Sequence, residues 1–208
     1  LIMELIDGAP WFDYIHDKDI AYDVLTVVDL MSDVSDAMQY LHGKEIMHRD
    51  LKSLNILVDC YLKHAHLIDF GFSKSKEQNN LRNTANAGTV SWMAPEMVMS
   101  PFIYDESVDV YSFSVVLWES LTRSTPFEEL EGQGFIGVIN AVVKGVRPIM
   151  PEVIDAPIKS LIESCWDGDR QLRPSFAKIH ATLTSTEVRN TLDLHRTIPW
   201  VNCLYCKK

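Results

Sequence analysis

Apolar residues recur every three or four positions early in the chain, which is the spacing of one face of an α-helix. These positions are Val27, Val28, Leu30, Met31, Val34, Ala37, Met38 and Leu41. Gly43 follows just beyond Leu41, and glycine commonly ends helices. The pattern therefore predicts a long amphipathic helix that ends shortly before residue 44.

Two other hydrophobic patterns predict further elements. Residues Ile56 to Val58 and Ala65 to Ile68 are short apolar runs on either side of a turn, and we expect two strands there. These strands would bring Asn55 and Asp69 near each other. From about Val108 to Thr122 the residues are apolar on all sides, which predicts a buried helix.

A glycine pattern near residue 134 invites a nucleotide-binding interpretation. Gly132 to Gly137 match G-x-G-x-x-G, but a phosphate-binding version must follow a strand. Here the pattern follows an acidic run and opens a helical apolar spacing at Phe135, Ile136, Ile139, Val142 and Val143. We interpret it as the start of a helix.

The segment from His48 to Asn55 matches the pattern H-R-D-L-x-x-x-N. Phosphoryl transfer requires a carboxylate that orients and deprotonates the attacking hydroxyl, and an amide oxygen that holds Mg²⁺ beside the phosphates. Asp50 and Asn55 have the chemistry and the spacing for these two roles. The segment therefore predicts a catalytic loop.

Two more motifs follow in the required order. Asp69-Phe70-Gly71 forms the D-F-G triplet, in which Asp binds Mg²⁺ and the packing of Phe sets the active or inactive state. Ala94-Pro95-Glu96 is the triplet that closes the activation segment. Three ordered motifs make coincidence a poor explanation.

On these motifs the chain resembles the eukaryotic protein kinases, and it is most similar to the tyrosine kinase-like group of Ser/Thr kinases. The group resemblance rests on Lys52-Ser53, Gly88 to Glu96, Asp109 to Phe113, Cys165-Trp166 and Arg173 to Phe176. The resemblance implies a mainly α fold, the kinase C-terminal lobe with short β-strands beside the catalytic loop. It implies a kinase domain over residues 1–184 and a C-terminal tail over 185–208.

The resemblance also implies roles for individual residues, with ATP and Mg²⁺ as cofactors. Asp50 would be the base, Lys52 would contact the transferred phosphate, and Asn55 and Asp69 would hold Mg²⁺. The adenine would lie against Met3, Glu4, Leu5, Ile6 and Leu57. Structural or regulatory roles fall to His48, Arg49, Phe70, Gly71, Thr84, Thr89, Glu96, Asp109 and Arg173.

Several of these implied roles are specific. Asp109 would brace the catalytic-loop backbone, and Glu96 would form a structural salt bridge with Arg173. Thr89 would hydrogen-bond near Asp50, a pairing typical of Ser/Thr kinases, although dual specificity stays open.

Kinases also use a Gly-rich loop and a strand Lys, and neither precedes His48 in this chain. The first residues resemble the kinase hinge, so we expect the N-terminal β-lobe to be largely absent. Two functions follow: a protein kinase that phosphorylates Ser/Thr hydroxyls of proteins, or a non-catalytic lobe that acts as a docking or regulatory module.

The activation segment is polar in its middle and contains Ser73, Ser75 and Thr84 among basic residues. A phosphate there adds about two negative charges and would pair with Arg49. We expect Thr84 to be the phosphorylated residue, and an unmodified loop stays the alternative.

Composition narrows the class of protein. The 208 residues are 47% hydrophobic and 23% charged, which is typical of a globular domain. A net charge of −10 argues against nucleic-acid and anionic-membrane binding. The apolar stretch near Ser114 to Trp118 is broken by Glu119, so no membrane segment is expected. Four cysteines without a disulfide pattern favour a cytoplasmic location.

Overall fold

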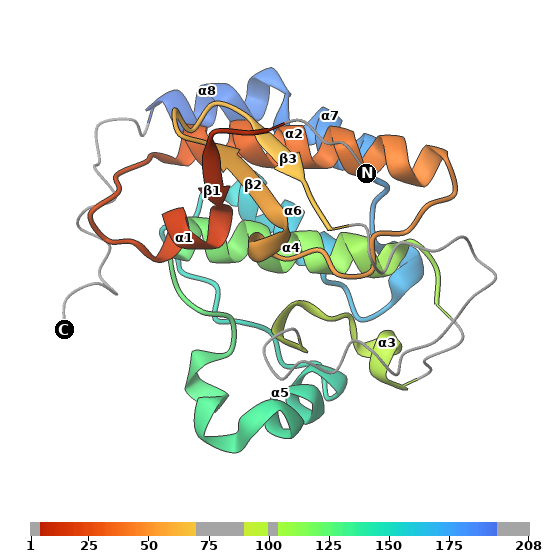
Figure 1. Cartoon of the computed structure of the whole chain (residues 1–208). Helices are drawn as coiled ribbons and strands as arrows, with labels where there is room; N and C mark the ends of the chain where they lie inside the picture. The colour runs from red at the N-terminus through yellow and green to blue at the C-terminus, as the bar shows by residue number, and fades with distance from the viewer. Residues whose placement is uncertain (1–4, 70–89, 100–103, 195–208) are drawn as a thin grey trace.

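The computed structural model describes residues 5–69, 90–99 and 104–194 of the chain. This part is mainly helical, with one small antiparallel sheet next to the catalytic loop, which confirms the predicted fold class (Figure 1). The α-helices are α1 (Trp11–His16), α2 (Val24–Gly43), α3 (Pro95–Met99), α4 (Ser107–Thr122), α5 (Gly134–Val143), α6 (Ala156–Cys165), α7 (Phe176–Leu183) and α8 (Thr186–Leu194). The strands are β1 (Gly8–Pro10), β2 (Ile56–Asp59) and β3 (Ala65–Leu67), and short 3₁₀ turns are η1 (Ser53–Asn55), η4 (Val90–Trp92), η5 (Glu128–Gln133) and η6 (Arg170–Leu172).

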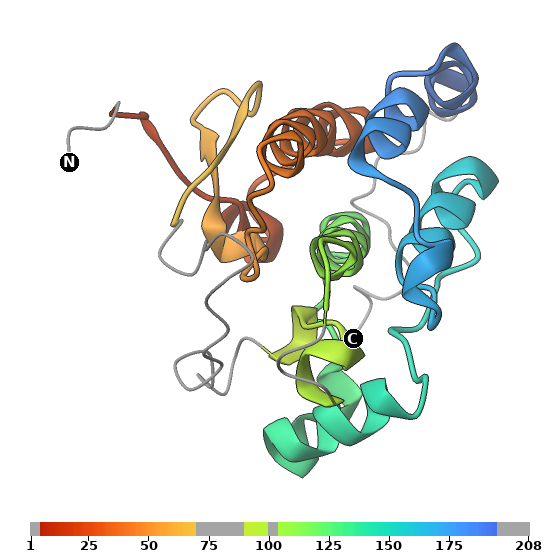
Figure 2. The same cartoon turned by 90° about the vertical axis from the view of Figure 1, so that its right-hand side faces the viewer.

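Helix α2 is the long amphipathic helix that the apolar spacing predicts. Asp23 caps its first turn, because the Asp23 carboxylate accepts a hydrogen bond of 2.8 Å from the backbone amide of Thr26. Its apolar face is buried, and helices α7 and α8 pack against it (Figure 2). The helix thus ends at Gly43, shortly before the catalytic loop.

Helix α4 runs through the centre of the molecule, between α2 and the segment that carries α5 (Figures 1 and 2). Its residues from Val108 to Thr122 are all buried, as the predicted all-round apolar pattern requires. Arg123 follows in a left-handed conformation, with φ of 54°. Its guanidinium donates hydrogen bonds to the carbonyls of Ile15 and Ile20, which fixes the end of α1 to α4.

The sheet has the order β1-β2-β3, and both pairs of neighbouring strands are antiparallel. The predicted strands on either side of the turn are confirmed as β2 and β3. Strand β1 approaches β2 so closely that a Cβ atom on Gly8 would lie 2.0 Å from the carbonyl oxygen of Val58. Glycine is therefore required at this position for the two strands to pair.

The predicted helix after Gly132 is confirmed as α5, which begins at Gly134. Helix α8 lies in the stretch that the sequence assigns to a C-terminal tail. Val188 and Leu192 of α8 are buried, and α8 contacts both α2 and α7. The end of the described chain therefore adds to the same hydrophobic core.

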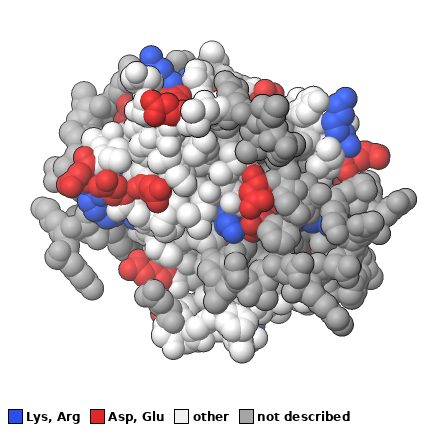
Figure 3. Space-filling view, in the orientation of Figure 1, with Lys and Arg blue, Asp and Glu red and all other residues white. Residues whose placement is uncertain are grey.

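Acidic side chains are scattered among uncharged residues on the face shown in Figure 3, where basic side chains are few. This agrees with the net charge of −10. Within the described ranges, none of the helices combines the length and the apolar character that crossing a bilayer demands.

Candidate active site

The catalytic loop leaves α2 through a tight turn and enters the core at once. The amide of Ile46 donates to the carbonyl of Leu41, with an N···O distance of 3.0 Å, and Glu45 has a positive φ of 58°. His48, Arg49 and Asp50 are then buried. The first part of the loop therefore lies inside the protein.

Asp109 on α4 holds the backbone of this loop. Its Oδ2 accepts a hydrogen bond of 2.9 Å from the amide of His48, and its Oδ1 accepts one of 2.7 Å from the amide of Arg49. Asp109 is fully buried, so these amides satisfy a carboxylate that water cannot reach. The chain path before Asp50 is fixed as a result.

Asp50, Lys52 and Asn55 converge on one carboxylate oxygen. The amide nitrogen Nδ2 of Asn55 lies 2.9 Å from Asp50 Oδ2 and 2.7 Å from the Asp50 carbonyl oxygen. Lys52 Nζ lies 2.8 Å from the same Oδ2. The other oxygen, Oδ1, is buried and has no hydrogen-bond partner among the described residues. The two oxygens of the Asp50 carboxylate therefore have different surroundings, because Oδ2 is held by Asn55 and Lys52 and Oδ1 is not.

The chain that leads to Asp69 pairs with the chain at Asn55. In the antiparallel pair of β2 and β3, the amide of Ile68 donates to the carbonyl of Asn55, with an N···O distance of 3.0 Å. His48 Nδ1 accepts from the amide of Asp50, so its Nε2 is the nitrogen that donates to the Ile68 carbonyl, at 3.3 Å. The segment that ends at Asp69 therefore lies against the catalytic loop.

A family model described as protein tyrosine and serine/threonine kinase matches residues 1–183. The chain belongs to this family. Its curated relatives include the serine/threonine-protein kinase STY17 of Arabidopsis thaliana, 35% identical over 180 residues. The RGS domain-containing serine/threonine-protein kinase A of Dictyostelium discoideum is 40% identical over 164 residues, and the light-sensor protein kinase of Ceratodon purpureus is 38% identical over 210. The resemblance that the motifs indicate, including the tyrosine kinase-like group, is confirmed.

The matched part of each relative is small. The alignments cover 86% of this kinase chain and 30% of STY17, 77% and 14% for the Dictyostelium kinase, and 86% and 16% for the Ceratodon kinase. The kinase chain therefore spans less than a third of the length of these three relatives.

Glu96 and Arg173 form a bidentate salt bridge between α3 and the segment before α7. Arg173 Nη1 lies 2.6 Å from Glu96 Oε1, and Nη2 lies 3.0 Å from Oε2. The arginine side chain is fully buried and also donates to the carbonyls of Ser107 and Asp167. The predicted ion pair is thus present, and it ties the activation segment to the start of α4.

The remaining predicted residues are placed only in part. Leu57 is half-buried in β2, Ile6 is half-buried, and Leu5 is exposed. Leu57 lies in the central strand of the sheet, where it is paired with Pro10 of β1 and His66 of β3. The other predicted residues lie outside the described part of the kinase: Met3, Glu4, Phe70, Gly71, Thr84 and Thr89.

The structure adds a residue that the sequence does not single out, His42 in the last turn of α2. Its Nε2 lies 2.9 Å from Asp109 Oδ2, and its ring packs edge-on against Phe176 with centroids 5.0 Å apart. His42 therefore links α2 to the carboxylate that holds the catalytic loop. A histidine near a helix C-terminus, just before the motif, is the sequence signal that could have identified it.

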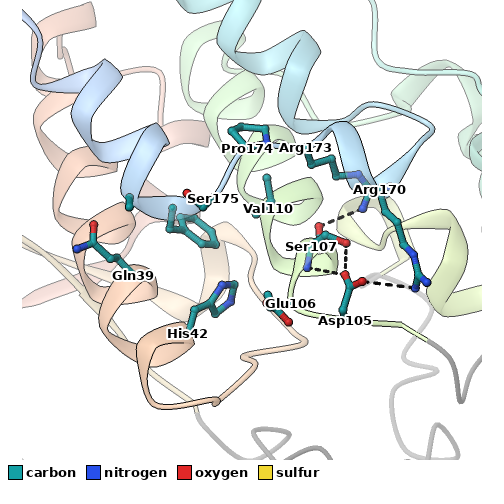
Figure 4. A pocket seen from close by; sticks show the side chains of 12 residues that line it. Gln39, His42, Asp105, Glu106, Ser107, Val110, Arg170, Arg173, Pro174 and Ser175 are labelled. Atoms are coloured by element: carbon teal, nitrogen blue, oxygen red, sulfur yellow. Dashed lines mark hydrogen bonds and ion pairs between the residues drawn. The ribbon is translucent and has the colours of Figure 1, made fainter.

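His42 also lines a cavity of about 410 Å³ between α2, the start of α4 and the start of α7 (Figure 4). The polar lining is largely paired with itself: Ser107 donates to Asp105, and Arg170 Nη1 lies 3.7 Å from Asp105 Oδ2. Asp50, Lys52 and Asn55 are not among its lining residues. The cavity is thus separate from the Asp50 carboxylate.

Proposed function

We propose that this kinase domain transfers the γ-phosphoryl group of ATP to Ser/Thr hydroxyls of proteins, with Asp50 as the base. The observation that carries the proposal is the asymmetry of the Asp50 carboxylate. Asn55 and Lys52 hold Oδ2, whereas Oδ1 is buried without a donor among the described residues. An oxygen in this state is suited to accept the proton of an attacking hydroxyl.

Asn55 and Asp69 have the chemistry to hold a magnesium ion. Both acceptors that Asn55 meets take hydrogen bonds from its Nδ2, so its side-chain oxygen points away from Asp50. This amide oxygen and the Asp69 carboxylate are oxygen ligands of the kind that Mg²⁺ prefers, and the pairing of β2 with β3 supports their joint role because it holds the chain before Asp69 beside Asn55. Bound Mg-ATP would supply the transferable phosphoryl group and neutralise its charge.

The other roles follow from position. Lys52, beside the Asp50 carboxylate, would contact the transferred phosphate, and Leu57 with Met3 to Ile6 would contact the adenine. Protein substrates, Ser/Thr preference and a cytoplasmic site of action belong to the same proposal. The relatives' names and the family match support protein substrates and Ser/Thr preference. The cytoplasmic location rests on the absence of a disulfide pattern among the cysteines of the sequence.

Regulation by phosphate is a further part of the proposal. Arg49 is buried, and its Nε and Nη2 have no hydrogen-bond acceptor among the described residues, while its guanidinium lies over Tyr104, 5.8 Å from the ring centre. A phosphate on Thr84 would supply the missing acceptors. Mass spectrometry of active protein should find phosphate on Thr84, and active protein without phosphate between residues 73 and 89 would contradict this.

Asp50→Asn in the full-length protein tests the catalytic proposal. Phosphotransfer should fall by about 10²- to 10⁴-fold, because the amide cannot act as a base, while ATP affinity changes little. Asp29→Asn, at a half-exposed position on α2, is the matched control and should keep full activity. Equal activity of the Asp50 variant and the wild type would remove Asp50 from the mechanism. Phosphoamino-acid analysis of the product separates Ser/Thr from dual specificity.

A further inference from the structure

A second fully buried carboxylate lies near the catalytic loop, Glu119 on α4. Its Oε1 accepts hydrogen bonds from Ser53 Oγ at 3.1 Å and from His16 Nε2 at 3.0 Å. Its Oε2 accepts one from Trp92 Nε1 at 2.9 Å. Three donors that are distant in the sequence therefore meet on one side chain.

The three donors come from three different elements: the catalytic loop, η4 and α1. Ser53 follows Lys52 in the catalytic loop, and Lys52 lies 2.8 Å from Asp50. Trp92 belongs to η4, directly before α3 and the ion pair of Glu96. His16 ends α1 and is the partly exposed member, with 22% of its side chain accessible. Glu119 thus connects the catalytic loop, the end of the activation segment and α1.

A carboxyl group suits this position because of its two oxygens and not because of its charge. Burial has the largest effect and raises the pKa of Glu119, whereas the hydrogen bonds from His16, Trp92 and Ser53 act in the opposite direction. Two oxygens are needed, because the donors approach from both sides, and an amide has a single acceptor oxygen.

Other ionisable groups near Glu119 are engaged elsewhere. Tyr22 lies close enough for the charge of Glu119 to affect its pKa, but its hydroxyl donates to the Ser120 carbonyl. Arg123, directly after α4, donates to the carbonyls of Ile15 and Ile20. Among the described residues, His16 is therefore the ionisable side chain seen to touch the carboxylate.

We propose that Glu119 is a positioning residue, which sets the end of the activation segment relative to the catalytic loop. The inference rests on the proposed kinase function. Through Ser53 and Trp92, Glu119 would fix where a protein substrate lies relative to Asp50. Nucleotide binding, which involves neither Ser53 nor Trp92 in the proposed function, would be little affected.

The test uses three variants of the full-length protein. Ser53→Ala removes one donor without touching η4, and Glu119→Gln replaces the carboxylate with its neutral isostere. The matched control is Ser120→Ala, which removes the buried hydroxyl next along α4 that accepts from Trp11 Nε1 at 2.7 Å. For each variant, kcat and the KM values for peptide and for ATP are measured, together with backbone hydrogen exchange in residues 48–56 and 90–97.

Glu119→Gln should lower kcat/KM for the peptide by about 10- to 100-fold, because a misplacement of about 1 Å at a reacting centre can cost about 100-fold. The KM for ATP should stay within about 2-fold of the wild-type value. Ser53→Ala should raise the peptide KM and also speed exchange in residues 90–97, which it does not contact. Ser120→Ala should change neither.

Two outcomes would overturn the inference: equal peptide kinetics for wild type and Glu119→Gln, or exchange in Ser53→Ala that rises only within residues 48–56. A wild-type protein without phosphotransfer activity would contradict the proposed function instead. In that case the exchange measurement still decides whether Glu119 couples the two segments, so the two failures can be told apart.

Discussion

Helix α4 carries two fully buried carboxylates, and they hold the active site in different ways. Asp109, in the first turn, accepts two backbone amides of the catalytic loop and the ring of His42. Glu119, near the other end, accepts only side-chain donors among the described residues. The same chemical group thus fixes main chain at one end of the helix and side chains at the other.

This difference determines how each end depends on the sequence. The amides that Asp109 binds belong to the backbone, so they are present whatever side chains occupy positions 48 and 49. The hydrogen bonds between Asp109 and the loop backbone therefore require no particular side chain other than Asp109. Glu119 requires Ser53, Trp92 and His16 together. We therefore expect the Asp109 end to be sensitive to removal of the acid, and the Glu119 end to be sensitive to each of several residues.

Removal of Asp109 should have the largest effect on stability. Asp109→Ala leaves two buried amides and His42 without an acceptor, and each unsatisfied donor costs about 1–3 kcal/mol. The free energy of unfolding should fall by about 3–5 kcal/mol, measured by urea denaturation, and phosphotransfer should be lost.

Asp109→Asn provides the comparison, because its amide retains one acceptor oxygen. Its free energy of unfolding should fall by less than that of the Ala variant. Equal losses in the two variants would mean that the hydrogen bonds to the loop contribute little, and the contrast between the two ends of α4 would not hold.

The ion pair of Glu96 and Arg173 supports the Asp109 end, because Arg173 also donates to the carbonyl of Ser107 at the start of α4. Glu96→Gln keeps the shape and removes the charge. Hydrogen bonds to charged groups contribute about 1.5–3 kcal/mol, so we expect a loss of about 2 kcal/mol in unfolding free energy. Arg170→Gln, whose contact with Asp105 is longer at 3.7 Å, is the control and should lose less.

The sequence predicts the Asp109 end far better than the Glu119 end. The motif from His48 to Asn55 and the all-round apolar pattern of α4 locate the catalytic loop, its supporting helix and the strands that flank Asn55. These features depend on local spacing. Helix α8 and strand β1 have weaker sequence patterns, because both depend on contacts with distant parts of the chain. Val188 of α8 is buried only in the assembled core, and Gly8 of β1 permits a close approach that exists only when β1 lies beside β2.

The Glu119 contacts were not predicted, because Ser53, Trp92 and His16 are far apart in the chain. One signal was available. A carboxylate inside a helix predicted to be buried on all sides must have donors around it, since an unpaired buried charge is very unfavourable. The sequence thus indicates that Glu119 has partners, whereas only the three-dimensional arrangement identifies them.

A pH series distinguishes Glu119 from uncharged substitutes. Its pKa in the folded protein is raised above the ordinary value of 4.5, mainly by burial. Between the unfolded pKa of about 4.5 and the higher folded pKa, the folded state binds more protons than the unfolded state. The contribution of Glu119 to the unfolding free energy is therefore greatest below about pH 4.5 and decreases as pH rises through the folded pKa. The unfolding free energy of wild type minus that of Glu119→Gln should decrease over the same interval. A difference that is constant with pH, or that increases, would contradict the burial of a charged Glu119.

The smallest effect is expected far from both carboxylates, at the pair of Asp29 on α2 and Arg189 on α8. Their side chains are 50% and 40% exposed, although Asp29 Oδ1 lies 2.7 Å from Arg189 Nη2. Exposed pairs contribute about 0–1 kcal/mol, so Asp29→Asn should change the unfolding free energy by less than about 1 kcal/mol. Added salt should reduce even this difference. A loss as large as that of Glu96→Gln would show that contact distance, and not burial, sets the strength of ion pairs in this lobe, and the interpretation of both ends of α4 would need to change.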